Sequence, residues 1–290
     1  MKSPGSLALR PLVSILLAIF SVQGGATIAK TLFPVIGAAG TTAIRIALSA
    51  IVLLAAFRPP VHRFTSAQWR AVVPYGVTIG VMNLLFYQAL VLIPLGLAVT
   101  LEFVGPLAVA IVGSRRALDA VWVVLAAIGI ALVTPWQAGS AIDPLGVALA
   151  LLTGVCWAAY IVLGGRVSQV LTGGVAVATG MSIATLIVLP FGLAGGGLGS
   201  LSPRLYAAGF AVAVLSSALP FTLEMHALRA LPGRTFSILM SLEPAVAALC
   251  GLVFLAEHLT QAQWAAVGLV IAASVGATMT ARQIPVREEV

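Results

Sequence analysis

The sequence predicts an all-α membrane protein of ten transmembrane helices, arranged as two inverted five-helix repeats. Hydrophobic residues make up 61% of the 290-residue chain and charged residues only 8%. Mean hydropathy is +1.13, which leaves more apolar surface than a soluble core could bury. Apolar runs long enough to cross a hydrocarbon layer of about 30 Å recur along the chain. A proline spacing that occurs once in each half indicates the repeats.

Ten apolar runs are expected to span the membrane. In order, they cover roughly residues 11–29, 37–57, 71–92, 95–113, 120–137, 144–165, 174–195, 205–228, 233–255 and 262–281. The first run follows Lys2 and Arg10, as the apolar core of a signal peptide would. Because no small-x-small cleavage site closes it and nine more runs follow, we expect it to be retained as a helix.

The basic residues predict the orientation of these spans. The formal net charge is +7, which in a soluble protein would suggest nucleic-acid binding. With both termini in the cytoplasm, the external loops hold only Lys30 and Arg204. The cytoplasmic segments then hold Lys2, Arg10, Arg58, Arg63, Arg70, Arg115, Arg116, Arg166, Arg229, Arg234, Arg282 and Arg287. This asymmetry follows the positive-inside rule, so we attribute the charge to topology and lipid contact and expect no nucleic-acid partner.

The proline spacing relates the two halves of the chain. Pro94 and Pro106 frame LGLAVTLEFVG, and Pro232 and Pro244 frame GRTFSILMSLE, at an offset of 138 residues. Each frame contains a glutamate inside an apolar segment. The spacing indicates a duplicated helix pair.

We therefore expect two units, residues 1–140 and residues 141–290, each with five helices. An odd number of helices per unit makes the second unit enter the membrane from the opposite side. Inverted repeats of this kind place a substrate site near the membrane midplane, where the two units meet, and allow alternating access.

Arg45 and Glu102 are charged residues inside predicted spans, where an unpaired charge costs about 2.5–3.5 kcal/mol. Each lies seven or eight residues from the outer end of its helix, a depth of about 10–12 Å. One interpretation is a structural ion pair that holds two helices together. The other, equally weighted, is a pair of groups that bind substrate.

Glu243 directly precedes Pro244 near the middle of the ninth span. A proline inside a helix removes one backbone hydrogen bond and loosens the preceding turn. A carboxyl group beside freed carbonyls can bind a proton, as in the broken helices of carriers. The alternative is a kink whose glutamate faces a neighbouring hydroxyl such as Ser241; we favour the proton site.

Other polar residues have weaker predictions. Glu224 and His226 lie near the inner end of the eighth span, where Glu224 can extend to the cytoplasmic surface beside Arg229 or Arg234. Five side chains are candidates to line a cavity with Arg45 and Glu102: Gln23, Asn83, Tyr87, Trp157 and Tyr160. Tyrosine and tryptophan also occur in ordinary membrane-interface belts.

Several chemistries are disfavoured by the sequence. GGATIAKT (24–31) lacks the glycine that a Walker motif needs before Lys30, so an ion gradient is favoured over ATP as the energy source. Cys156 and Cys250 lie within predicted spans without metal-ligand spacing and are expected to be small apolar residues. Gly76 and Gly80 are expected to serve packing within the monomer. We expect no metal, no cofactor and no obligate protein partner.

Sequence blocks over nearly the whole chain, residues 10–282, resemble the EamA family of the drug/metabolite transporter superfamily. These blocks are SVQGGATIAKTLFP, TTAIRIALS, YGVTIGVMNLLFYQAL, IPLGLAVTLEFVGPLAVAIVGSRR, LPFTLEMHALRALPGRTFSILMSLEPAVAAL and LAEHLT. Within the family, they are most similar to bacterial carriers that export threonine and homoserine. The family's Glu-Pro element falls on Glu243 and Pro244, whereas Glu102 is separated from Pro106 by Phe-Val-Gly.

The resemblance implies a secondary transporter in the bacterial inner membrane, with both termini cytoplasmic, that exports small amino acids by proton antiport. Arg45 would then bind the substrate carboxylate, Glu102 its ammonium group, and Glu243 the proton. The nearest alternative is an EamA exporter of purines, aromatic amino acids or cationic drugs. A membrane-embedded enzyme is disfavoured because the three histidines are well separated, and a channel because no helix is polar along its full length.

Overall fold

The computed structural model describes residues 4–112, 117–133, 142–200, 202–220, 223 and 239–280. Within these ranges the chain is helical and has no strand, as the predicted fold class requires. The predictions made for Glu224, His226, Arg229, Pro232 and Arg234 concern residues outside the described ranges.

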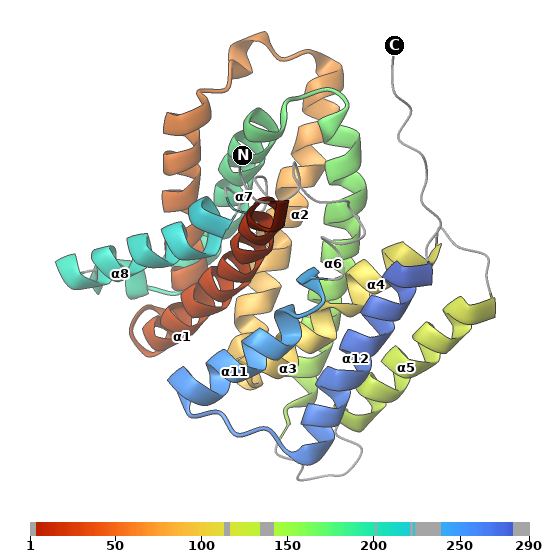
Figure 1. The fold of residues 1–290 in the computed structure, drawn as a ribbon. Coiled ribbons are helices and arrows are strands. Elements are labelled where there is room, and N and C mark those ends of the chain that lie inside the picture. The colour runs from red at the N-terminus through yellow and green to blue at the C-terminus, as the bar shows by residue number, and fades with distance from the viewer. Residues whose placement is uncertain are drawn as a thin grey trace, which may run out of the picture.

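The first helix, α1, runs from Pro4 to Phe57 and contains a single sharp break at Gly37 (φ 71°, ψ 163°). The first two predicted spans, residues 11–29 and 37–57, therefore meet at this break, and residues 30–36 between them are helical. A positive φ is accessible to glycine without a steric penalty, so one residue redirects the chain. Figure 1 shows the two parts of α1 as separate helices that meet at an angle.

The predicted span over residues 95–113 consists of two shorter helices, α3 (Leu95–Glu102) and α4 (Val104–Val112), separated at Phe103. The prediction of one continuous helix here is wrong. The eighth predicted span also departs from a regular helix, since α8 (Pro203–Ala213) continues into a π-helical turn, η3 (Val214–Ala218). Both irregularities turn out to lie at the same cavity.

The other helices fall within or overlap the remaining predicted spans. They are α2 (Ser66–Leu92), α5 (Ala117–Val133), α6 (Pro144–Ser168), α7 (Gly173–Ala194), α11 (Glu243–Leu255) and α12 (Gln261–Thr280), with short 3-10 turns η1 (Val61–Arg63) and η2 (Gly197–Ser200). Local chemistry fixes several starts. Thr65 forms a capping box with Gln68 before α2, and Asp143 accepts the Leu145 N–H before α6, which satisfies backbone donors that a helix start leaves free.

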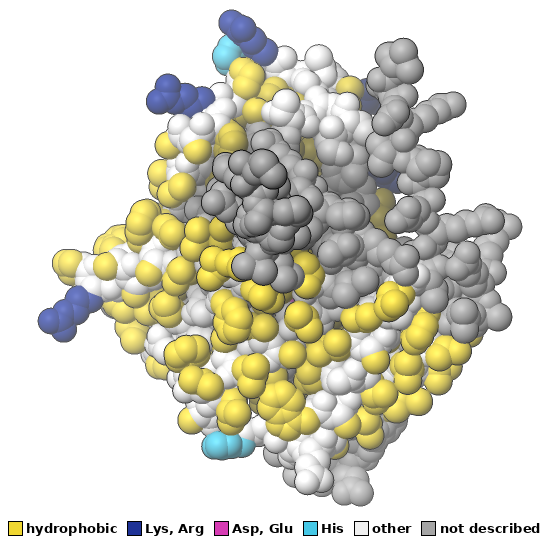
Figure 2. Space-filling model, viewed as in Figure 1, with side chains coloured by type: hydrophobic (Ala, Val, Ile, Leu, Met, Phe, Trp, Pro, Cys, Tyr) yellow, Lys and Arg dark blue, Asp and Glu magenta, His cyan; other side chains and the backbone are white. Residues whose placement is uncertain are grey.

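Four helical segments of the described chain are long and apolar enough to cross a membrane: Val13–Phe57, Ser66–Leu92, Pro144–Ser168 and Gly173–Ala194. Large apolar side chains face outward, with Leu186, Val253 and Phe254 67–70% exposed. Figure 2 shows apolar side chains spread over much of one face, with lysine and arginine at its periphery. Such a surface suits lipid and not water, so the chain is a membrane protein; ten helices and inverted repeats remain predictions.

Helices from the two halves of the sequence pack against each other. α3 lies beside α11, α5 beside α12, and α2 against both α6 and α7 (Figure 1). Small residues allow the close approaches: a Cβ on Gly76 would lie 2.7 Å from the Gly180 carbonyl oxygen, and one on Gly80 would lie 3.1 Å from that of Ala184. The prediction that the Gly76–Gly80 pair serves packing within the monomer is confirmed.

Candidate functional site

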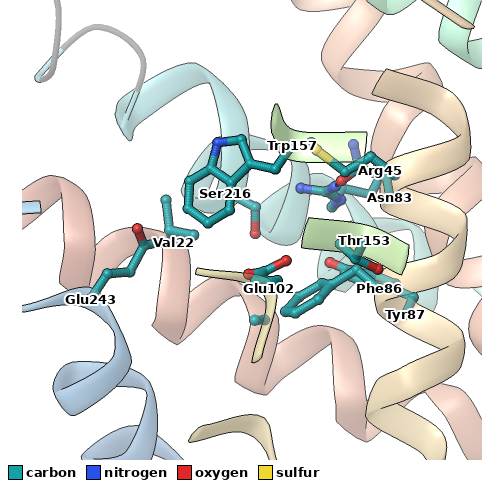
Figure 3. A pocket seen from close by; sticks show the side chains of 12 residues that line it. Val22, Arg45, Asn83, Phe86, Tyr87, Glu102, Thr153, Trp157, Ser216 and Glu243 are labelled. Carbon is teal, nitrogen blue, oxygen red and sulfur yellow. Dashed lines mark hydrogen bonds between the residues drawn. The ribbon is translucent and has the colours of Figure 1, made fainter. Parts of the chain in front are cut away.

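A cavity of about 170 Å³ lies between helices of both halves of the sequence. Six of the nine predicted site residues line it: Arg45, Asn83, Tyr87, Glu102, Trp157 and Glu243. They come from α1, α2, α3, α6 and α11. Figure 3 shows Arg45 and Asn83 on one side, Glu102 in the middle and Glu243 on the opposite side, beyond Val22.

Arg45 is held by two side chains one turn apart on α2. Its guanidinium donates a hydrogen bond to Asn83 Oδ1 and lies 5.0 Å from the centre of the Tyr87 ring. Asn83 is itself oriented by a 2.8 Å bond from Nδ2 to the Ile79 carbonyl oxygen. Arg45 is buried, at 7% exposure, so these contacts fix a desolvated cation beside the cavity.

The structural interpretation of Arg45 and Glu102, a direct ion pair, is wrong for this conformation. Among the described residues the only ion pair joins Lys30 to Glu257. Arg45 and Glu102 instead line one cavity from different helices. The structure therefore leaves space between a buried guanidinium and a carboxyl group.

Both cavity carboxyl groups lie where a helix is interrupted. Glu102 is the last residue of α3, directly before the break at Phe103, and Glu243 is the first residue of α11. Residues 241–242 form a turn, so the loosened backbone predicted before Pro244 is present. Interrupted helices inside membrane proteins commonly mark substrate or ion sites, because they leave backbone groups free to bind.

Gln23 and Pro244 support Glu243 without lining the cavity. Gln23 Nε2 donates to Glu243 Oε1 at 3.0 Å across 220 residues of sequence. Pro244 is buried in the first turn of α11, where a missing N–H carries little penalty. These contacts place one carboxylate oxygen of Glu243 in a defined direction.

Tyr160 lies in an adjoining cavity of about 210 Å³. The two cavities share five lining residues: Val22, Arg45, Met82, Asn83 and Ser216. The Tyr160 ring stacks on that of Tyr75, with ring centres 5.2 Å apart. Of the predicted site residues, Tyr160 is thus separated from Glu102 and Glu243 but not from Arg45.

The sequence analysis missed Thr153 and Ser216, which also line the first cavity. A hydroxyl residue inside an apolar run is the available signal, but hydroxyl residues are frequent in these spans. It also missed Glu257, whose carboxylate pairs with Lys30 and accepts the Leu95 N–H at 2.8 Å. These partners are 227 and 162 residues away in the chain, and no local pattern connects them.

The disfavoured chemistries find no support in the described residues. Residues 24–31, which faintly resemble a P-loop, lie inside α1. Their backbone therefore cannot wrap a phosphate. Cys156 and Cys250 are free thiols, and within the described ranges no three histidine, cysteine or acidic side chains gather where a metal could bind.

Comparison with known proteins identifies the family. Residues 144–279 match the EamA-like transporter family. The chain is 49% identical over 285 residues to the threonine/homoserine exporter RhtA of Escherichia coli K12, covering 97% of this chain and 96% of that protein. The chain belongs to the EamA-like transporter family. The RhtA of Salmonella typhimurium LT2 is 48% identical over 276 residues, covering 95% of the chain and 93% of that protein.

This EamA protein shares its fold with a protein of known crystal structure that is 20% identical in sequence. The TM-score of the match is 0.56, and it covers 98% of this chain and 100% of the other. The curated relatives are named as exporters. The predicted family and transporter class are therefore confirmed, and with them the prediction that the chain is not an enzyme.

Proposed function

We propose that this EamA protein exports threonine and homoserine from the cytoplasm in exchange for protons, across the bacterial inner membrane and with both termini cytoplasmic. The observation that carries the proposal is the small cavity in which buried Arg45 faces two carboxyl groups across open space. The chain is 49% identical to a threonine/homoserine exporter over 97% of its length, which supports the choice of substrate. The positive-inside pattern of the loops supports the orientation.

Arg45 and Glu102 have the chemistry to bind the two charges of an amino acid. A guanidinium can form two parallel hydrogen bonds to a carboxylate, and a carboxylate can accept from an ammonium group. Since Asn83 and Tyr87 hold Arg45, little side-chain entropy is lost when substrate binds. In this proposal the zwitterion bridges the gap between the two residues and supplies the ion-pair partners that they lack.

The cavity size favours a small substrate. Pockets for drug-sized ligands commonly enclose about 300–1,000 Å³, whereas this cavity encloses about 170 Å³. Threonine and homoserine each have eight non-hydrogen atoms, fewer than a purine nucleoside, an aromatic amino acid or a typical cationic drug. The first cavity by itself therefore suits a small amino acid, and the single arginine favours a solute that carries a carboxylate over a purine or a cationic drug.

Glu243 is proposed to carry the proton. It lies in the cavity with Glu102, at a helix interruption and within reach of the amide of Gln23. A carboxyl group placed so can bind a proton from one side of the membrane and release it on the other as the two halves move. Entry of the proton would accompany release of the amino acid.

The substrate assignment is tested by counterflow in proteoliposomes of the purified protein. Vesicles loaded with unlabelled solute are diluted into labelled threonine, and uptake is compared for threonine, homoserine, tryptophan, a purine and a cationic dye as the loaded solute. Loaded threonine and homoserine should drive uptake, while the other three should not. Absence of labelled-threonine uptake into vesicles loaded with threonine would contradict the amino-acid assignment. Counterflow of labelled tryptophan, purine or dye into vesicles loaded with the same solute would then support the corresponding alternative.

A further inference from the structure

Two hydroxyl groups on the cavity wall, those of Tyr87 and Ser216, are buried. They lie near enough to interact with each other, but neither makes a hydrogen bond of good geometry to a described residue. Tyr87 is only 2% exposed. Buried polar groups in proteins are nearly always partnered, because an unmade hydrogen bond leaves the cost of desolvation uncompensated. A polar group of a molecule in the cavity could complete both.

Other hydroxyl groups in and near the cavity are already used. Thr153 donates to the Leu149 carbonyl oxygen at 2.9 Å, and Thr27 donates to that of Gln23 at 2.7 Å. Each bond reaches back one turn along its own helix, the usual arrangement for threonine and serine in membrane helices. Ser216 lies in the π-helical turn η3 and has no such bond.

The surrounding contacts hold η3 in place. Ser21 on α1 donates from Oγ to the Leu215 carbonyl oxygen at 2.7 Å. Gly25 lies one turn further along α1. A Cβ at this position would overlap Ser216 Oγ, so the glycine leaves room for the hydroxyl. Figure 3 shows the Ser216 hydroxyl pointing into the cavity between Trp157 and the Glu102 carboxyl group. π-Helical turns inside α-helices often lie at functional sites, and this one directs a hydroxyl into the cavity.

We propose that Ser216 Oγ, together with the Tyr87 hydroxyl, binds the side-chain hydroxyl of the transported amino acid. The proposal rests on the proposed function and adds the feature that selects the substrate. Threonine and valine have nearly the same shape, as do homoserine and norvaline, and each pair differs by a hydroxyl in place of a methyl group. With valine or norvaline bound, the two buried hydroxyls would gain no partner from the ligand, so the site discriminates against both.

The test compares Ser216→Ala and Tyr87→Phe with the wild type and with a matched control, Ser217→Ala. Ser217 is the next residue of the same turn and lines the adjoining cavity but not the first. Efflux from proteoliposomes is measured for threonine, valine, homoserine and norvaline. In parallel, the rise in Tm that each amino acid produces is measured on detergent-solubilised protein, so that binding is read even if a variant transports poorly.

The wild type should prefer each hydroxy amino acid over its methyl isostere. Ser216→Ala and Tyr87→Phe should each reduce this preference by about three- to tenfold, the effect of one neutral hydrogen bond, while Ser217→Ala leaves it unchanged. If the wild type transports threonine but Ser216→Ala keeps the wild-type preference for hydroxy amino acids, the assignment of Ser216 is overturned and the proposed function stands. If Ser216→Ala lowers transport of all four amino acids equally, Ser216 has a structural role and its assignment to the substrate hydroxyl is overturned as well. A wild type that transports and binds none of them would overturn the proposed function itself.

Discussion

At the scale of single residues, Arg45 shows how a membrane protein holds a charge without an ion-pair partner. Asn83 accepts from its guanidinium and the Tyr87 ring lies beneath it, while Nε has no partner among the described groups. Such an arrangement is incomplete by itself, since a buried guanidinium has five N–H donors to satisfy. In the proposed function the substrate carboxylate completes it.

Arg45→Lys should raise the KM for threonine by about tenfold, or about 1.4 kcal/mol, with a smaller change in kcat. Lysine keeps the charge but loses the paired N–H donors and the stacking on Tyr87. Proteoliposome efflux measures the effect, and Arg166→Lys, at an exposed position near the end of α6, is the matched control. If Arg45→Ala lowers protein abundance as much as it lowers transport, the residue has a structural role instead.

Glu243→Gln should make cells that depend on this protein more sensitive to excess homoserine. Glutamine cannot carry a proton, yet its amide oxygen can still accept from Gln23, so this hydrogen bond survives. Growth at increasing homoserine concentrations measures the effect, with protein abundance checked by immunoblot. Asp143→Asn, the same chemical change at the start of α6 outside the cavity, should behave as wild type. Unchanged resistance in Glu243→Gln would remove Glu243 from the mechanism.

At the scale of helices, the break between α3 and α4 after Glu102 is in close backbone contact with α6. A Cβ on Gly154 of α6 would lie 2.8 Å from the Glu102 carbonyl oxygen, and a Cβ on Gly105 of α4 would overlap the Gly154 carbonyl oxygen. Trp157, one turn after Gly154, packs edge-on against Phe103 with ring centres 5.2 Å apart. The break between α3 and α4 therefore fits directly against α6.

Gly105→Ala should destabilise the protein by about 1–3 kcal/mol, the usual cost of forcing an extra methyl group into a filled space. Because the clash is with backbone, a side-chain rotation cannot relieve it. Gly165→Ala is the control: it lies in α6 with no atom within 4 Å of the added Cβ, and alanine is the better helix former. Tm in detergent should fall for Gly105→Ala only. Equal Tm values would contradict the described contact.

Glu257 joins three segments at one end of the molecule. Its carboxylate pairs with Lys30 of α1 and accepts the Leu95 N–H at the start of α3, while Lys30 also donates to the Ile93 carbonyl oxygen at 3.3 Å. Charge-assisted bonds to a helix N-terminus are among the stronger contacts in proteins. The predicted topology places this cluster at the external surface.

A double-mutant cycle on Lys30→Gln and Glu257→Gln should show coupling. Each single change leaves a half-buried charge without its partner, so the double variant should lose less stability than the two single changes add up to. Tm values of the four proteins measure the coupling. Additive losses would mean that the ion pair contributes nothing measurable.

Sequence reasoning succeeded where a residue's own type carries the information. Hydropathy located the helices, and a charge inside an apolar span singled out Arg45, Glu102 and Glu243, all of which line one cavity. It did not locate three backbone irregularities: the turn at Gly37, the break at Phe103 and the π-helical turn around Ser216. Glycine and proline are frequent along the chain, so residue type alone does not say which of them breaks a helix. Long-range pairs such as Gln23–Glu243 have no local signature.

At the scale of the whole molecule, the site is built from both halves of the chain. Arg45 and Glu102 come from the first predicted unit, and Trp157, Ser216 and Glu243 from the second. A movement of the two predicted units relative to each other would therefore change the side from which this site is reached. Carriers with inverted repeats achieve alternating access in this way.

The predicted orientation is tested by cysteine labelling at two exposed arginines. Arg204 is the second residue of α8, and Arg63 is the last residue of η1. Each is replaced by cysteine in turn. Intact spheroplasts should label Arg204→Cys with a membrane-impermeant maleimide, and Arg63→Cys should label only after lysis, with the parent protein as the control for Cys156 and Cys250. The reverse pattern would invert the topology.

The most direct test of proton-coupled amino-acid export is threonine efflux from proteoliposomes under an imposed pH gradient. For vesicles loaded with labelled threonine, efflux from the wild type should accelerate when the external medium is more acidic than the interior, and a protonophore should remove the acceleration. Glu243→Gln should show no acceleration at the same protein content. Wild-type efflux that does not respond to the gradient, or a Glu243→Gln variant that responds fully, would contradict the proposed mechanism.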